Sequence, residues 1–252
     1  MKQIELEQFL NNFLDIRSFK DYGPNGLQVQ GKPEIKKIAF SVSASREAIA
    51  NTVKNNCDSL ITHHGIFWNY QKNVITKQFY NRVAPLIKND ISLFGYHLPL
   101  DAHLEIGNAA TIAQQLGLTN IQPFGEYKGN FLGVSGSFQS SIKAEDLAHR
   151  LEHLFDHTII HASDDKQRAL QSIGIITGGA NNEWKEALNQ GLDAYLTGEI
   201  SEYNWHDAIE AGIDYFACGH HATEKLGIKS LMNLIEKKFN IEVIFLDSEN
   251  LA

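Results

Sequence analysis

The sequence predicts an α/β protein of two similar lobes, whose sheets are mostly parallel or mixed. Short apolar segments alternate with segments of helical periodicity along the 252 residues. That order is typical of parallel strands joined by helices. The strand–helix–strand order begins again at residues 171–200. We therefore expect a first lobe at 1–122 and a second at 123–252, with the C-terminal segment able to pack back on the first lobe.

The first half contains a clear alternation of elements. Ile4, Phe9 and Phe13 fall on one helical face, which predicts a helix over 4–14. The stretch "DYGPNGLQVQG" (21–31) is rich in turn residues. Apolar runs and helical patterns then follow in turn, as strands at 36–42, 58–63 and 91–97 and helices at 45–56, 77–88 and 106–116.

The second half begins with a region of different composition. "GNFLGVSGSFQSS" (129–141) is typical of a strand pair interrupted by glycine and serine. A helix is expected over 143–155 and a strand over 157–163. After the unit at 171–200, the apolar run "IDYFAC" (213–218) predicts a strand, and a helix is expected to begin near Ala222.

The restart indicates an internal duplication. At an offset of 135 residues "KIAFS" (37–41) falls on "SIGII" (172–176), Asp58 falls on Asp193 and His63-His64 falls on Gly198-Glu199. At an offset of 123 residues, "FGYHLPLD" (94–101) falls on "ACGHHATE" (217–224). The two lobes would then share a strand–helix–strand unit.

Composition excludes several classes of protein. The net charge of -8 argues against general affinity for nucleic acid, which usually needs a basic face. The two cysteines, Cys57 and Cys218, are too few for a disulfide framework and fit a reducing compartment. The N-terminus has no apolar core typical of a signal peptide, and no apolar stretch could span a membrane. We expect a cytoplasmic protein.

Five side chains at expected strand ends could bind metal. They are His63, His64, Asp101, His220 and Glu224. Ligands of open α/β sheets bind beyond the carboxyl ends of strands. Taken singly, each motif has a plainer interpretation: a hydrogen-bonded loop for the histidine pair, a helix cap for Asp101, and capping for His220 and Glu224.

The chemistry of this set favours a pair of divalent ions. Imidazole and carboxylate together suit Zn, Fe, Mn, Co or Ni better than Cu(I), Ca or Mg. Five ligands exceed the three that usually hold one catalytic metal, whereas a bridging carboxylate would let them hold two ions.

Five stretches resemble one family. They are "PNGLQVQG" (24–31), "DSLITHHGIFW" (58–68), "HLPLDAH" (97–103), "DAYLTGEI" (193–200) and "GHHATEKLGI" (219–228). These resemble the NGG-interacting-factor-like family, whose bacterial members include dinuclear-metal hexamers called GTP cyclohydrolase 1 type 2 homologues. The resemblance covers nearly the whole chain and fits the short bacterial form.

The resemblance carries further implications. It implies that His63, His64, Asp101, His220 and Glu224 are the ligands of two divalent ions per subunit, in the cleft between the lobes of a hexameric ring. The chain departs from the family pattern at "SVSAS" (41–45), where an aspartate is common, and at His221. His220 is preferred to His221 as the ligand because its spacing to Glu224 matches the family motif.

Two further residues are candidates for catalysis. His97 could be a sixth ligand, a residue that orients a carboxylate, or a general acid or base. Glu199 falls on His64 in the duplication and could contact a substrate or transfer a proton. The plainer interpretation of Glu199, Glu202 and His206 is that of ordinary loop residues after a strand.

Three weaker motifs favour structural roles. "ITGGANNEW" (176–184) could cradle a phosphate, but it fits a tight strand-to-helix turn better. The histidines 149, 153 and 157 recur every four residues and are typical of a solvated face. Both cysteines are expected to be small buried residues.

The function expected is that of a metal-dependent hydrolase acting on a small molecule. GTP cyclohydrolase activity follows from the resemblance alone, and only Lys225 and Lys229 of the motifs could meet a triphosphate. The alternative is a non-catalytic metal-binding ring that serves as a scaffold. A nucleic-acid-associated ring fits the low pI least well.

Overall fold

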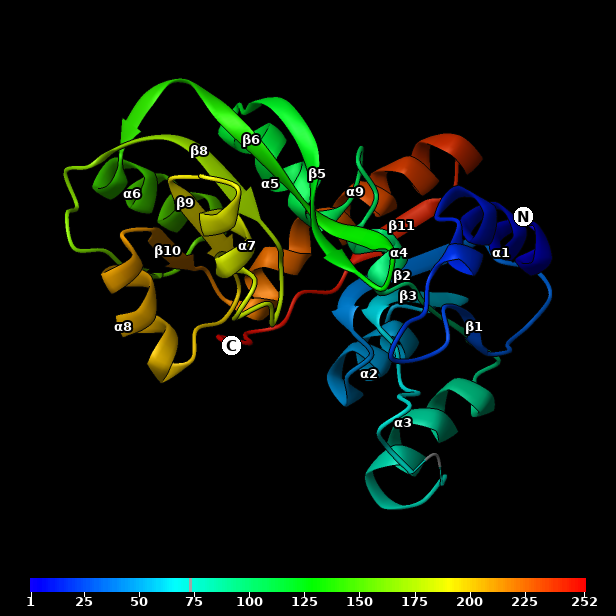
Figure 1. The fold of residues 1–252 in the computed structure, drawn as a ribbon. Coiled ribbons are helices and arrows are strands. Elements are labelled where there is room, and N and C mark those ends of the chain that lie inside the picture. The colour runs from blue at the N-terminus through cyan, green and yellow to red at the C-terminus, as the bar shows by residue number, and fades with distance from the viewer. Residues whose placement is uncertain (73) are drawn as a thin grey trace. The chain divides into compact units, whose positions relative to one another are not determined.

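The computed structural model describes residues 1–72 and 74–252, which form two compact units. The first unit contains Met1–Leu100 and Ile228–Glu249, and the second contains Asp101–Gly227 and Asn250–Ala252 (Figure 1). The units divide after Leu100 instead of at 122. The helix α5 (Asn108–Leu116) explains the difference, because it buries Ala109, Ile112 and Ala113 in the core of the second unit.

The first unit is built on a five-stranded sheet in the order β1-β4-β3-β2-β11. Four strands run parallel to one another: β2 (Lys37–Ser43), β3 (Ser59–His64), β4 (Ser92–Gly95) and β11 (Glu242–Phe245). The edge strand β1 (Gly26–Val29) is antiparallel to β4 and lies inside the segment expected to be a turn.

The helices of the first unit follow the predicted order. They are α1 (Gln3–Phe13), the 3-10 turn η1 (Ile16–Ser18), α2 (Arg46–Lys54), α3 (Lys77–Lys88) and the C-terminal part of α9 (His220–Phe239). Ser45 caps α2 by accepting a hydrogen bond from the amide of Ala48. The short helix α4 (Leu98–Asp101) follows β4.

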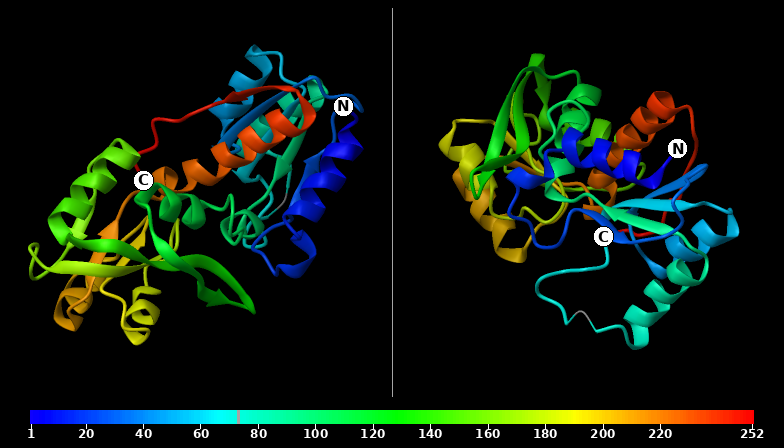
Figure 2. Two further views of the ribbon diagram at one scale, coloured as in Figure 1. Left: turned by 90° about the horizontal axis from the view of Figure 1, so that it is seen from above. Right: turned by 90° about the vertical axis from the view of Figure 1, so that its right-hand side faces the viewer.

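The second unit contains a six-stranded sheet in the order β5-β6-β8-β9-β10-β7. The strands β8 (Ala169–Ile175), β9 (Ala194–Thr197) and β10 (Asp214–Ala217) are parallel, and β7 (Ile160–Ala162) is antiparallel to β10. The strands β5 (Thr119–Tyr127) and β6 (Asn130–Lys143) form the long hairpin seen in Figure 2. The stretch expected to hold a strand pair is therefore one continuous strand with partners on both sides.

Helices cover the two faces of this second sheet. The helices α5, α6 (Ala144–Phe155) and the start of α9 contribute to a core with Ile173, Leu196 and Phe216. The helices α7 (Trp184–Asn189) and α8 (Glu202–Ala211) contribute to a separate core with Tyr195 and Tyr215. Neighbouring residues of one strand thus enter different cores, as strand geometry requires. Among the described residues, no helix has the length and hydropathy needed to cross a membrane.

Strand register shows that the two units are similar. Ile38, Ala39 and Phe40 pair with Ser59, Leu60 and Ile61 in the first unit. Ile173, Gly174 and Ile175 pair with Ala194, Tyr195 and Leu196 in the second, all 135 residues later. Two buried strands therefore follow one pattern, and the predicted pair of similar α/β lobes is confirmed.

Two carboxylates occupy matching places in this pattern. Asp58 accepts hydrogen bonds from the amides of Lys36 and Lys37 at 2.6 and 3.1 Å. Asp193 accepts them from Gln171 and Ser172 at 2.7 and 2.9 Å. Each carboxylate joins the start of one strand to the next.

The third strand of the repeat differs from the expected alignment by one residue. The amide of Tyr96 donates to the carbonyl of Thr62, and the amide of Cys218 donates to the carbonyl of Thr197. That register gives an offset of 122 residues, so His97 corresponds to Gly219. His220 stands one position further along and already lies in α9, which begins earlier than expected.

Candidate metal centre

The adjacent histidines close β3 and lie with their rings together. His63 is fully buried, His64 is half-buried, and their ring centroids are 4.7 Å apart. His63 uses Nδ1 to donate to the carbonyl of Tyr96 at 3.0 Å. Nδ1 of His64 lies 3.0 Å from the hydroxyl of Ser43. Each contact fixes one ring nitrogen and directs Nε2 to serve as the ligand atom, as is usual for metal-binding histidines.

His97 follows β4 and completes a group of three imidazoles. Its ring centroid lies 5.0 Å from that of His63 and 5.5 Å from that of His64. One nitrogen from each of the three rings lies within 4.8 Å of the other two, close enough to share a metal ion.

Asp21 holds His97 in place. Its Oδ1 lies 2.7 Å from Nδ1 of His97, and its Oδ2 accepts from the amide of Leu98 and the side chain of Asn25. Burial alone would raise the pKa of Asp21, but His97 and these hydrogen bonds outweigh it and lower the pKa. The side chain is only 2% exposed, so it acts as a buried acceptor for the imidazole. This role could not be predicted from the sequence, because an aspartate in "DYGPNG" is typical of a turn.

The side chain of Gln28 explains why two positions beside the histidines are glycine. Its carbonyl oxygen accepts from the amide of Ile66 and its amide donates to the carbonyl of Pro24. A Cβ at Gly65 would lie 2.2 Å from Nε2 of Gln28, and one at Gly95 would lie 2.6 Å from it. The side chain of Gln28 therefore fits only against glycines where β3 and β4 end.

The second unit contains a group of its own, with one histidine and two carboxylates. Nε2 of His220 lies 3.2 Å from Oε1 of Glu224, one helical turn later, and Glu224 is buried. Since α9 begins at His220, the helix itself sets this pairing. Oδ1 of Asp101 accepts from Asn108 at 2.8 Å and from Thr177 at 3.2 Å.

Glu199 contacts the other side of the His220 ring. Its Oε1 lies 2.6 Å from Nδ1 of His220, so the expected catalytic carboxylate orients a candidate ligand. Burial alone would lower the pKa of His220, but Glu224 and Glu199 outweigh it and raise the pKa to about 9. A metal ion would therefore have to displace a proton from this ring.

The Gly-Gly turn makes room for Glu224. A Cβ at Gly178 would lie 2.5 Å from Oε1 of Glu224 and 3.2 Å from Nε2 of His220. The amide of Gly178 donates to Thr223, and its carbonyl accepts from Thr197. That amide is used within the protein, which favours the tight turn over a phosphate cradle.

The donors therefore fit a divalent ion. Four imidazoles have Nδ1 against a protein oxygen, and two of those oxygens belong to the carboxylates of Asp21 and Glu199. Nitrogen and oxygen donors held in this way suit Zn, Fe, Mn, Co or Ni. The chain thus contains groups that could hold metal.

Other histidines have separate partners. His149 pairs with Glu152 at 3.4 Å, His157 contacts the carbonyl of Cys218 at 2.7 Å, and His153 is exposed. The amide of His221 donates to the carbonyl of Ala252. The helical spacing of these histidines therefore reflects no shared site.

The remaining motif residues divide between surface and core. Glu202 and His206 lie exposed on α8. Both cysteines are buried, and desolvation raises the pKa of Cys57 to about 11 and that of Cys218 well above its usual value.

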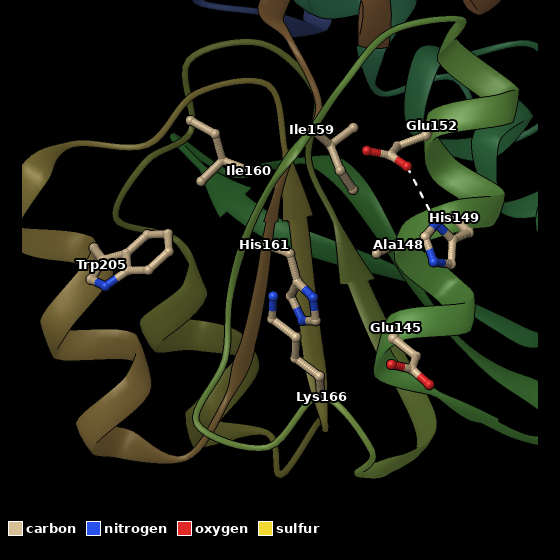
Figure 3. Close-up of a pocket in the computed structure, with 9 residues that line it drawn as sticks. All are labelled: Glu145, Ala148, His149, Glu152, Ile159, Ile160, His161, Lys166 and Trp205. Atoms are coloured by element: carbon tan, nitrogen blue, oxygen red, sulfur yellow. Dashed lines mark hydrogen bonds and ion pairs between the residues drawn. The ribbon is translucent and has the colours of Figure 1, made fainter.

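A separate pocket in the second unit was not expected from the sequence. It has a volume of about 470 Å³ and is lined by His161, Lys166, Trp205 and one face of α6 (Figure 3). Nε2 of His161 lies 2.7 Å from the buried carboxylate of Asp214, which also accepts from Arg168 at 3.0 Å. This charged group joins the edge strand β7 to β10, so it supports the sheet.

Known proteins resemble this chain over its whole length. The GTP cyclohydrolase 1 type 2 homolog of Pasteurella multocida (strain Pm70) is 41% identical over 252 residues, which cover 100% of both chains. The homolog of Escherichia coli (strain K12) is 37% identical and is also covered completely.

Solved structures share the fold. A structure described as protein ybgI of unknown function has a TM-score of 0.94 and 38% identity, with 100% of both chains covered. TTHA1606 from Thermus thermophilus has a TM-score of 0.88 and 29% identity, with 99% of both chains covered. Reduced HcgD from Methanocaldococcus jannaschii has a TM-score of 0.86 and 25% identity, with 98% of both covered. The family described as Duf34/NIF3 (NGG1p interacting factor 3) matches residues 1–251, and this chain belongs to that family.

Proposed function

We propose that the protein is a metal-dependent hydrolase that binds two divalent ions per chain. The proposed ligands are His63, His64, Asp101, His220 and Glu224. The observation that carries the proposal is the group of three imidazoles His63, His64 and His97, with one nitrogen of each within 4.8 Å of the others. Such grouping is expected of metal ligands and uncommon among histidines that merely fill a core.

The protein's own residues would supply position and proton transfer. Divalent ions would act as Lewis acids and favour the deprotonation of water. Asp21 and Glu199 hold His97 and His220 by Nδ1, at 2.7 and 2.6 Å. His97 would serve either as a sixth ligand or as the group that moves a proton to or from the substrate.

The names of the relatives support the choice of a first substrate. Those named GTP cyclohydrolase 1 type 2 homolog make GTP the first substrate to test. Hydrolytic opening of a heteroaromatic ring begins with the attack of water on a ring carbon, which Lewis acids promote.

Metal analysis tests the proposal directly. The protein would be reconstituted with Zn, Mn, Fe, Co or Ni, dialysed, and analysed by inductively coupled plasma mass spectrometry. We expect about two ions per chain in the wild type. Fewer than one in every case would contradict the two-metal proposal.

Two variants make the measurement specific. Glu224→Gln removes a proposed ligand while keeping its shape, and Glu202→Gln changes an exposed glutamate on α8 as a matched control. The first should lose metal and the second should not. His97→Ala separates the two roles of that residue, because a ligand variant loses metal whereas a proton-transfer variant loses only activity.

We also propose a cytoplasmic homohexamer. Its support is the family resemblance. Light scattering coupled to size exclusion should then give six times the 28.3 kDa of one chain. A monomer at micromolar concentration would contradict it.

A further inference from the structure

We infer that Tyr22, Trp68 and Tyr70 form an aromatic shelf that binds a planar heteroaromatic ring beside the three imidazoles. The inference rests on the proposed function, since it assigns a substrate class to the same site. All three residues belong to the first unit, as do His63, His64 and His97.

Ring geometry places the shelf against the histidines. The rings of Trp68 and His97 are perpendicular, with centroids 5.2 Å apart. The Trp68 centroid lies 6.0 Å from that of His64, and the Tyr22 centroid lies 6.1 Å from that of His97. Trp68 and Tyr22 therefore border the three imidazoles directly.

Two loops carry the shelf, and hydrogen bonds to backbone carbonyls hold these loops together. The amide of Asn69 donates to the carbonyl of Tyr22 at 2.7 Å, and its side chain donates to the carbonyl of Asp21 at 3.2 Å. A Cβ at Gly23 would lie 2.3 Å from the carbonyl oxygen of Phe67, so the loops touch at a glycine. Asp21 also holds His97, and the shelf and the histidines therefore share one support.

The shelf presents aromatic surface to solvent. Tyr70 is 71% exposed and Tyr22 is 43% exposed, so both rings are open to a ligand. Trp68 and Tyr70 lie nearly parallel, with an interplanar angle of 20° and centroids 5.9 Å apart. The parallel rings continue a stack, and every nucleobase has a face that can extend it.

The arrangement of the rings favours a flat ring over an organic cation. Aromatic cages that bind ammonium groups enclose the cation with ring faces. Here the rings of Trp68 and Tyr70 lie almost parallel instead, at an interplanar angle of 20°. Parallel rings offer a flat face to stack on and do not enclose a cation.

Ligand-detected NMR titration of the reconstituted protein tests the shelf. Guanosine, adenosine and uridine are the probes, and ribose is the probe without an aromatic ring. We expect the three nucleosides to bind and ribose not to bind. Trp68→Ala and Tyr70→Ala should each weaken nucleoside binding by about five- to a hundredfold, the usual range for losing one stacked ring.

Matched aromatics elsewhere are the controls. Tyr80 is 47% exposed on α3 and Trp205 is 38% exposed on α8. Tyr80→Ala and Trp205→Ala should bind nucleosides like the wild type. Equal loss in the controls, no loss in the shelf variants, or no nucleoside binding by the wild type would overturn the inference.

Metal content, measured on the same samples, separates this inference from the proposed function. Shelf variants with full metal content and weakened nucleoside binding support both. Full metal content with no nucleoside binding overturns the shelf alone. Absence of metal from the wild type overturns the proposed function, whatever the nucleosides do.

Discussion

Single contacts decide how the candidate ligands are held. Asp101 rests on Asn108 and Thr177, and His220 lies between Glu199 and Glu224. Each ligand therefore depends on a second residue for its orientation. Such supporting residues are as open to test as the ligands themselves.

Glu199→Gln should weaken metal binding without unfolding the protein. The amide keeps the shape of Glu199 but removes the charge that orients His220 from 2.6 Å. Loss of such a partner usually lowers metal affinity by about 10- to 100-fold. Competition with a fluorescent chelator measures the affinity. Unchanged affinity would show that Glu199 does not orient a ligand.

Gly178→Ala should displace Glu224 and reduce metal content. Gly178 has a φ of +70°, and a Cβ there would meet Oε1 of Glu224 at 2.5 Å. Gly191→Ala is a matched control, because its φ is +71° and a Cβ there has nothing within 4 Å. Both variants carry the same left-handed strain, about 1–2 kcal/mol. Only Gly178→Ala should lose metal; equal loss in both would assign the effect to backbone strain.

At the scale of elements, the repeated strand–helix–strand unit sets the fold. Asp58 and Asp193 each accept two amides where one strand begins beside the next. An exposed aspartate would be free to vary, but these two fix the register of a buried pair of strands. The sequence alignment at an offset of 135 residues predicts that the two aspartates are equivalent.

Asp58 should make the free energy of unfolding depend on pH in the acidic range. Burial alone would raise its pKa, but Lys32 and the amides of Lys36 and Lys37 outweigh it and lower the pKa. The charged form is therefore the more stable one when folded. This stabilisation is complete above the unfolded pKa of about 4 and is lost as pH falls through the folded value.

Asp58→Asn should remove that dependence. We expect it to lower the free energy of unfolding at neutral pH by about 1–3 kcal/mol, because it removes a charged acceptor. Between a pH of about 4 and the folded pKa, urea unfolding of the variant should vary less with pH than that of the wild type. Asp207→Asn, at an exposed position of α8, is the control. Parallel pH profiles for Asp58→Asn and the wild type would contradict the assignment.

The limits of sequence prediction also lie at this scale. Apolar runs predicted β2, β3, β8, β9 and β10, because buried parallel strands are continuous and apolar. The apolar face of α5 could pack on either sheet, so the sequence could not place the boundary between the units. Asp21 and Gln28 were missed because their partners His97, Gly65 and Gly95 are distant in sequence.

At the scale of the whole molecule, metal and stability should be linked. A ligand that binds only the folded chain raises its stability by an amount that grows with ligand concentration. At a metal concentration about a hundredfold above the dissociation constant, the gain is about 2.7 kcal/mol. Reconstituted protein should therefore unfold at a higher temperature than protein treated with a chelator.

Differential scanning calorimetry measures this gain. Glu224→Gln should gain less stability from metal than the wild type, since it lacks a proposed ligand. Glu202→Gln should behave like the wild type. A gain of equal size in Glu224→Gln would place the metal elsewhere in the chain.

The buried thiols of Cys57 and Cys218 have a practical consequence. Only the thiolate reacts with maleimides and related reagents, and desolvation keeps both thiols protonated at neutral pH. The native protein should therefore remain unlabelled while it is folded. A cysteine introduced at the exposed position of Lys72 would then take a single fluorophore, and that dye could follow the arrival of a ligand at Tyr70 in real time.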